Sequence, residues 1–311
     1  MIKISSLSRH YAEFKAVDDV SFDIQAGEVV GLLGHNGAGK TTIMKMMTGF
    51  LEPTDGMIRV DELEMGKDTR KIQKRIGYLP ENCPVWPEMT VIDYLMYQAE
   101  LHGVAAGDQQ TAVARAIRRT ALKEKAGATI QTLSRGYRQR VGVAQAILHD
   151  PDIIILDEPT NGLDPTQISQ MRNLIRELAE SATVILSTHI LQEVQAVCSR
   201  VLIMRSGKLV VNARLGDLQL GQRLLLSIDN DSAVPYLRGI DGVRSVEECD
   251  SQDNHSAYLL EADADLAPDI AAAVIAAGDQ LFGLQPEVRN LETVFAEVNT
   301  QVNEPTGKEA E

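Results

Sequence analysis

The sequence lacks the long apolar segments that mark membrane-spanning proteins. Its longest uninterrupted apolar runs, IAAAVIAA at 270–277 and IIIL at 153–156, are far shorter than the ~18 residues that a transmembrane helix needs. The first residues, MIKISSLSRHYAEF, also lack the apolar stretch and the small-residue cleavage site of a secretory signal. We therefore expect a cytoplasmic protein that inserts no segment of its own into lipid.

Cysteine is also scarce. Cys83, Cys198 and Cys249 are odd in number, far apart in the sequence and outside any CxxC pair. This pattern argues against both a disulfide framework and a zinc site. It predicts three reduced thiols that are mostly buried.

Basic residues are rare in the last third of the chain. The 311 residues include 30 Lys plus Arg and 44 Asp plus Glu, which gives a formal charge of −14. Residues 1–219 are nearly neutral, with 25 basic and 26 acidic side chains, whereas residues 220–311 have 5 and 18. Because phosphate binding depends on clustered Lys and Arg, we expect no nucleic-acid partner. The acidic surface is either a plain solvated face or a contact for another protein.

Length and charge together predict two domains. At about 150 residues per domain the chain has room for two, and its 44% of hydrophobic residues can form sizeable cores. The polar, Gly-containing segment 216–222 separates the two charge regimes. We place one domain at 1–219, an acidic accessory domain at 220–302 and a disordered tail at 303–311.

Residues 1–219 alternate short β-rich runs with helical stretches, which is typical of an α/β fold with a mostly parallel sheet. Strands are predicted at 28–33, 76–79, 152–157, 183–187 and 201–204. Several are apolar throughout, as central strands buried on both faces are. The near alternation at 17–24 predicts an antiparallel subdomain at the amino end, and about 81–149 is predicted to be a helical insertion.

The accessory domain has a different pattern. It predicts strand 223–229, helix 234–239, strands 243–248 and 256–261, helix 267–277 and strand 280–285. The order βαββαβ is that of a small α+β, ferredoxin-like unit. A final helix is predicted at 291–300.

The strongest chemical signal is the segment GHNGAGKTT, which satisfies the phosphate-loop pattern G-x-x-x-x-G-K-[ST] between a predicted strand and a predicted helix. Its members are Gly34, His35, Asn36, Gly37, Ala38, Gly39, Lys40, Thr41 and Thr42. Such loops direct backbone N–H groups at phosphate oxygens, so Lys40 should neutralise the β- and γ-phosphates and Thr41 should offer its hydroxyl to Mg²⁺. The alternative is an ordinary Gly-rich turn.

A pair of acids follows the apolar strand DIIILD. Asp157 and Glu158 should lie at the carboxyl edge of the sheet, where open α/β folds bind ligands. We expect Asp157 to hold Mg²⁺ and Glu158 to polarise the attacking water as general base. The alternative is a strand that ends in two solvated acids.

The segment LSRGYRQRVGVAQAI, residues 133–147, resembles the signature segment of ATP-binding-cassette (ABC) ATPases, which is usually LSGGQ. Ser134 and Gly136 match it, whereas Arg135 and Tyr137 replace the usual Gly and Gln. The resemblance implies that Ser134 and Gly136 clamp a γ-phosphate at a helix N-terminus. Taken alone, the segment is better explained as a capped helix start, so this interpretation depends on the other motifs of the family.

Further segments extend the resemblance. NGLDP resembles the D-loop of the family, which implies that Asp164 lies at the subunit junction, and His189 in STHIL matches the histidine that senses the γ-phosphate. Tyr11 occupies the place where the family stacks an aromatic ring on adenine. Alternatively, His189 is a capped or surface residue, and Tyr11 is a strand residue that packs on Val17.

One departure concerns the metal site. IGYLPEN places Glu81 where most family members have a glutamine that touches Mg²⁺ and reports to the membrane subunit. The resemblance is to a prokaryotic export-type branch of ABC transporter ATP-binding subunits, found in gliding-motility and drug-export systems, with the same YLPE string. We interpret Glu81 as a variant metal ligand and coupling residue.

The resemblance implies an ATPase that works as a dimer. One phosphate loop and one signature cannot meet around one nucleotide within a subunit of the family, so two copies, or one copy and a paired ATPase subunit, would enclose two ATP molecules head to tail. A separate integral membrane permease would dock on the helical insertion near Trp86, which is either an exposed anchor or part of the local core. The expected function is therefore the ATP-hydrolysing subunit of an exporter, peripheral on the cytoplasmic face of the membrane. The alternatives are a soluble non-transport ABC ATPase and a regulatory nucleotide-binding module.

Overall fold

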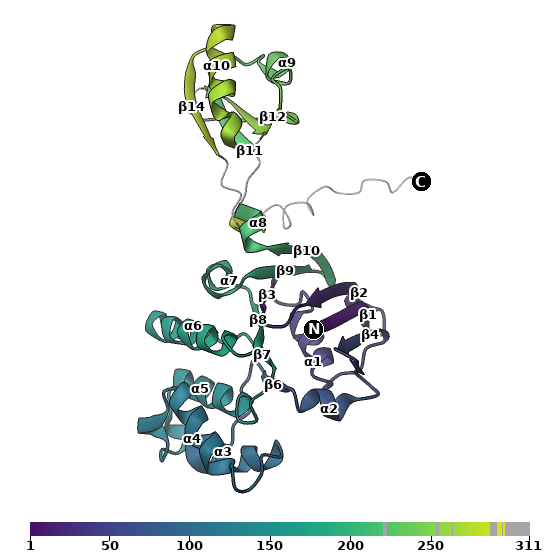
Figure 1. Cartoon of the computed structure of the whole chain (residues 1–311), viewed down its shortest axis with the longest axis vertical. Coiled ribbons are helices and arrows are strands. Elements are labelled where there is room, and N and C mark those ends of the chain that lie inside the picture. The colour runs from purple at the N-terminus through teal and green to yellow at the C-terminus, as the bar shows by residue number, and fades with distance from the viewer. Residues whose placement is uncertain (220–222, 253–254, 263, 287–290, 294, 296–311) are drawn as a thin grey trace. The chain divides into compact units, whose positions relative to one another are not determined.

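The computed structural model describes residues 1–219, 223–252, 255–262, 264–286, 291–293 and 295. The chain divides into two compact units, Met1–Arg214 and Leu215–Glu311 (Figure 1). The division falls after Arg214 rather than after residue 219, and the segment predicted as a boundary holds the short helix α8 (Leu215–Gln219). No helix among these described residues combines the length and the apolar character that crossing a bilayer requires.

A six-stranded sheet forms the centre of the first unit. Its order is β10-β9-β3-β8-β7-β6; neighbours from β9 to β6 run parallel, and β10 runs antiparallel at one edge. The bounds are β3 Val29–Leu33, β6 Ile76–Leu79, β7 Ile153–Asp157, β8 Thr183–Thr188, β9 Arg200–Arg205 and β10 Lys208–Arg214. Strand β7 is buried along its whole length, which requires the continuous apolar run that precedes its acid. The predicted parallel α/β core is confirmed.

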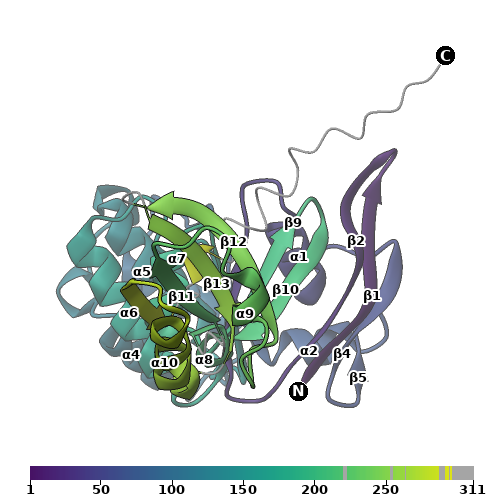
Figure 2. The same cartoon turned by 90° about the horizontal axis from the view of Figure 1, so that it is seen from above.

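A second, antiparallel sheet covers one side of this core, as predicted from the amino-terminal pattern. Its order is β2-β1-β4-β5, with bounds β1 Ile2–Tyr11, β2 Phe14–Ile24, β4 Asp55–Val60 and β5 Leu63–Glu64. Apolar residues of this sheet, of helix α1 (Lys40–Met47) and of the parallel sheet share one buried cluster. Figure 2 shows the antiparallel strands on one side of the unit and helices α4, α5 and α6 on the other.

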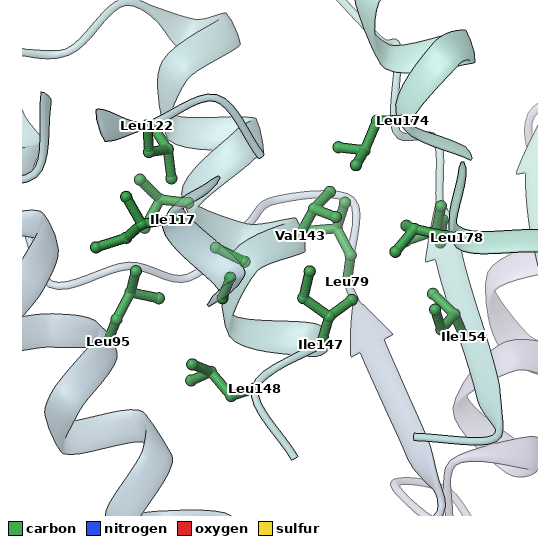
Figure 3. Close-up of a cluster of buried hydrophobic side chains, with 14 of the residues drawn as sticks. Leu79, Leu95, Ile117, Leu122, Val143, Ile147, Leu148, Ile154, Leu174 and Leu178 are labelled. Carbon is green, nitrogen blue, oxygen red and sulfur yellow. The ribbon is translucent and has the colours of Figure 1, made fainter. Parts of the chain in front are cut away.

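The helices of the first unit form a second buried cluster with the parallel sheet. Their bounds are α3 Val91–Leu101, α4 Gln109–Arg119, α5 Arg135–Ala146, α6 Pro165–Ala179 and α7 Leu191–Val197, whereas α2 (Thr69–Gln73) contributes Ile72 to the first cluster. Helix α5 connects the insertion to the core, because Val143 and Ile147 meet Leu95 and Ile117 of the insertion and Ile154 of β7 within one cluster (Figure 3). This packing holds the signature segment, at the start of α5, in a fixed place relative to β7.

The second unit has the element order βαββαβ. Its bounds are β11 Arg223–Ile228, α9 Val234–Leu237, β12 Ser245–Gln252, β13 His255–Glu261, α10 Ala267–Ala277 and β14 Leu281–Pro286. The strands form one antiparallel sheet in the order β12-β13-β11-β14, and its core includes Leu226, Tyr258 and Ile270. Of the helix predicted at 291–300, only residues 291–293 and 295 are described, and the predicted tail at 303–311 lies outside the described residues.

Candidate nucleotide-binding and hydrolysis site

The Gly-rich segment 34–42 connects β3 to α1, as the sequence predicted. Gly39 caps α1 with φ +103°, in the left-handed region that disfavours side chains. A Cβ atom there would lie 2.5 Å from the carbonyl oxygen of Ala16, so the backbone of the loop is pressed against β2. The conformation and the close approach both require glycine at this position.

Lys40 places its ammonium group inside the loop. The side chain is 6% exposed, and Nζ donates hydrogen bonds to the carbonyl oxygens of Gly34, at 2.6 Å, and His35, at 3.3 Å. Nζ also lies 3.5 Å from Oε1 of Glu158. The cation is therefore fixed between the loop and the acid that follows β7.

The acid pair lies at the carboxyl end of β7 and is not solvated. Asp157 is 0% exposed and Glu158 is 5% exposed, which excludes the alternative of two solvent-facing acids. The hydroxyl of Ser187, on the neighbouring strand β8, donates to Oδ1 of Asp157 at 2.5 Å and accepts the backbone N–H of Glu158 at 2.9 Å. One hydroxyl thus fixes both acids relative to β8.

Asp157 and Thr41 form an oxygen-rich pair that suits a divalent cation. Thr41 Oγ1 donates to Oδ1 of Asp157 at 3.3 Å, while the buried Oδ2 of Asp157 has no hydrogen-bond partner among the described residues. In the described part of the chain, no group of three or more His, Cys, Asp or Glu side chains is placed to hold a metal ion. This donor set fits Mg²⁺, which usually binds one or two protein oxygens together with substrate phosphates and waters.

His189 contacts the carboxylate of Glu158. Its Nδ1 lies 2.9 Å from Oε2 of Glu158, and its side chain is 41% exposed, so it faces both the acid and solvent. Glu158 itself has φ +49°, a conformation that costs a non-Gly residue of order 1 kcal/mol. Such strain is typical of functional sites.

A cavity of about 380 Å³ brings most of the predicted residues together. Its lining includes Asn36 to Thr42 of the loop, Glu158, Glu81 and Tyr11. Tyr11 is 47% exposed and ends β1, with the guanidinium of Arg9 4.8 Å from its ring centre. It pairs with Phe14 across the hairpin, not with Val17. This geometry favours the cavity-facing interpretation of Tyr11.

Glu81 lies in the loop after β6 and is exposed. Burial, followed by the negative charges of Asp157 and Glu81, raises the pKa of the Tyr78 hydroxyl on β6. The carboxylates of Asp157 and Glu81 therefore both act electrostatically on the hydroxyl of Tyr78. Glu81 lines the cavity together with Glu158, whereas Asp157 is buried behind it.

The signature residues lie away from this cavity. Ser134 caps α5, and its Oγ accepts the backbone N–H of Tyr137 at 3.4 Å. Gly136 is buried against the side chain of Gln167, where a Cβ atom would approach within 2.6 Å. Gln167 and Asp164 form a reciprocal capping box at the start of α6. Signature and D-loop segments thus form one continuous surface, and neither contributes to the described lining of the cavity.

Two residues of the site were not predicted from the sequence. Ser187 was predicted only as a strand end, and its role depends on the pairing of Asp157 with Ser187 in the parallel register of β7 and β8. Phe14, 63% exposed beside Tyr11, also lines the cavity. A second aromatic residue three positions after Tyr11 is the one sequence signal that could have indicated Phe14.

Comparisons with known proteins agree with this geometry. Residues 17–161 match the family described as ABC transporter. The chain is 37% identical over 229 residues to the ABC transporter ATP-binding protein NatA of Bacillus subtilis, covering 72% of this chain and 93% of NatA. It is 29% identical over 304 residues to the linearmycin resistance ATP-binding protein LnrL of the same organism, covering 95% and 97%.

A solved structure shows the same fold. The dimeric structure of MJ0796, a bacterial ABC transporter cassette, superposes with a TM-score of 0.64 at 23% identity and covers 69% of this chain and 99% of that one. The covered share of the chain matches the length of the first unit, where the phosphate loop, the acid pair and the signature lie. The identity to NatA over 93% of that protein places the chain in a family: it belongs to the ATP-binding proteins of ABC transporters and is an ATPase.

Proposed function

We propose that the cavity beside the phosphate loop binds ATP with Mg²⁺ and that Glu158 removes the proton from the attacking water. The observation that supports this most is the fixation of the Glu158 carboxylate between Lys40, at 3.5 Å, and His189, at 2.9 Å. A base held this way needs little reorganisation to accept a proton. His189 would respond to the γ-phosphate through its contact with the same carboxylate.

Other residues of the site would bind the metal ion, the phosphates and the base of the nucleotide. Thr41, Asp157 and Glu81 would hold Mg²⁺, which neutralises phosphate charge when bound. Backbone N–H groups of the loop and Lys40 would bind the phosphates. The Tyr11 ring, with Phe14 beside it, would stack on adenine.

The separation of Ser134 and Gly136 from the cavity supports a head-to-tail dimer. Each phosphate loop would then receive the signature of a second copy or of a paired ATPase subunit, with Asp164 at the junction. Because ATP lies between the two surfaces, binding would hold the subunits together and hydrolysis would release them. This cycle of contact would drive the transporter.

A second cavity supports docking of a membrane permease on the cytoplasmic face of the membrane. It measures about 680 Å³ and lies between the core and the helical insertion, with Phe50, Pro80, Pro84 and Leu101 in its lining. Phe50 is 76% exposed and Leu101 62% exposed, and apolar side chains with this exposure favour a protein contact. Trp86 is 48% exposed, lies in the segment that follows Pro84 and has its ring tilted against that of Tyr97, with 4.8 Å between the ring centres. The similarity to LnrL, named for linearmycin resistance, favours export.

The decisive experiment is the variant Glu158→Gln, which keeps the shape of the side chain and removes the base. We expect the ATPase rate to fall at least about 100-fold, within the range that general bases contribute, while ATP-dependent dimers accumulate. Glu124→Gln, at an exposed acid in the insertion, is the matched control and should leave the rate unchanged. Full hydrolysis by Glu158→Gln would show that another group is the base.

A further inference from the structure

Two exposed charges, one in the cavity lining and one on the signature segment, have no hydrogen-bond or ion-pair partner within the described part of the chain. Glu81 lines the nucleotide cavity, and Arg135 is the first residue of α5, next to Ser134. Among the described residues, neither side chain makes a hydrogen bond or an ion pair. Glu81 stands where most ABC ATPases have a glutamine and Arg135 stands where the signature usually has a glycine, so one position carries a negative charge and the other a positive charge.

The exposed side chain of Arg135 packs over the D-loop of its own chain. Its guanidinium lies against Gly162, where a Cβ atom would approach Cζ and Nη1 of Arg135 within 2.6 Å. Gly162 has φ +72°, so this turn of the D-loop favours glycine and leaves room for the arginine. The guanidinium therefore belongs to the same surface as Ser134 and Asp164.

In the head-to-tail dimer of the proposed function, these two charges would approach the same nucleotide from opposite sides. Glu81 lies on the side of Lys40 and the phosphate loop, and Arg135 comes with the signature of the other copy. We propose that Glu81 of each subunit pairs with Arg135 of the partner subunit across the bound ATP, twice per dimer. This inference rests on the proposed dimer and names the residues that select its partner.

Charge complementarity explains why a second copy of this chain is the fitting partner. A carboxylate beside the triphosphate is repelled by the phosphate oxygens unless a cation stands near it. A cassette with a neutral residue in place of Arg135 would leave Glu81 to Mg²⁺ alone, without a cation from the partner subunit, and this loss of charge complementarity disfavours such a cassette as partner. Because a carboxylate has two oxygens, the pair leaves one oxygen of Glu81 free to meet Mg²⁺.

The test is a charge-reversal cycle in the full chain with Glu158→Gln, where ATP-dependent dimers accumulate. The dimer dissociation constant is measured by analytical ultracentrifugation with ATP and Mg²⁺ for Glu81→Arg, Arg135→Glu and the double variant. We expect each single reversal to weaken the dimer about tenfold and the double variant to return within about threefold of the reference. Glu81→Arg should thus weaken the dimer beside Arg135 and strengthen it beside Arg135→Glu.

The sign of this effect separates a direct ion pair from an effect of Glu81→Arg on the nucleotide or the metal alone. If Glu81→Arg acts only by attracting phosphate, it strengthens both backgrounds; if it acts only by losing a metal ligand, it weakens both. Either result overturns the pair. Reversal of exposed charges outside the cavity, Arg118→Glu and Glu124→Arg, is the matched control and should change the constant less than about twofold. A reference chain that forms no ATP-dependent dimer would instead refute the proposed function, and the pair with it.

Discussion

Replacing Ser187 by alanine should destabilise the first unit and disturb its acid pair. Ser187 is 0% exposed, and its hydroxyl serves Oδ1 of Asp157 and the backbone N–H of Glu158. A hydrogen bond to a buried charged group contributes about 1.5–3 kcal/mol, and an unsatisfied buried N–H costs about 1–3 kcal/mol. Because local rearrangement recovers part of both costs, their sum is an upper bound, and we expect the free energy of unfolding to fall by about 3 kcal/mol.

The assay is thermal unfolding of the full chain, followed through the transition of the first unit. At about 2–4 °C per kcal/mol for a domain of this size, the midpoint should fall by about 6–12 °C. Ser187→Thr keeps the hydroxyl and should lose much less. Ser199→Ala, which removes an exposed hydroxyl that donates to the carbonyl oxygen of Val29 at 3.1 Å, is the matched control. A Ser187→Ala midpoint within about 2 °C of the parent would refute the reasoning.

Three further predictions concern docking, pH and packing. Phe50→Asp should lower the fraction of the chain that sediments with membranes, whereas Val210→Asp, at an exposed position on β10, should not. Burial, followed by the stacked ring of His149, lowers the pKa of His102 from 6.5 to about 4. The unfolded chain therefore takes up a proton at His102 before the folded chain does, so the fold keeps its full stability above pH 6.5 and loses part of it as the pH falls toward 4. Thermal midpoints should fall across that window, and less so in His102→Gln. Tyr94→Phe removes the partly buried hydrogen bond that the Tyr94 hydroxyl donates to Oε1 of Gln145 and should lower the free energy of unfolding in urea by about 1 kcal/mol; an unchanged free energy would contradict this.

The sequence predicted those parts of the fold whose burial is uniform. Residues 76–79 and 153–157 are buried or nearly so along their length, and a continuous apolar run at such strands is readable without knowledge of neighbours. By contrast, β10 alternates between exposed and half-buried positions at the edge of the sheet and was not predicted. Strand β1 was also missed, although Ile2, Ile4 and Leu7 are buried, because its bulged register interrupts simple alternation.

The candidate site could be predicted where the backbone itself defines it. The phosphate loop has a fixed spacing because glycines, a lysine and a helix start must follow one another within a few residues. Ser187 had no such signal, since its contact with Asp157 depends on which strand lies beside β7, and strand order is set by the packing of the whole sheet. Likewise, the unpaired state of Arg135 can be recognised only once every possible partner in the described part of the chain has a position.

The left-handed backbone of Glu158 also bears on how this site changes over evolutionary time. At φ +49° a glycine or an asparagine would suit the main chain better than glutamate does. Drift under selection for stability alone would therefore move this position away from a carboxylate. In a lineage that lost its transport task, residue 158 should be among the first of the site to change, and the protein it leaves behind should be harder to unfold than the working enzyme.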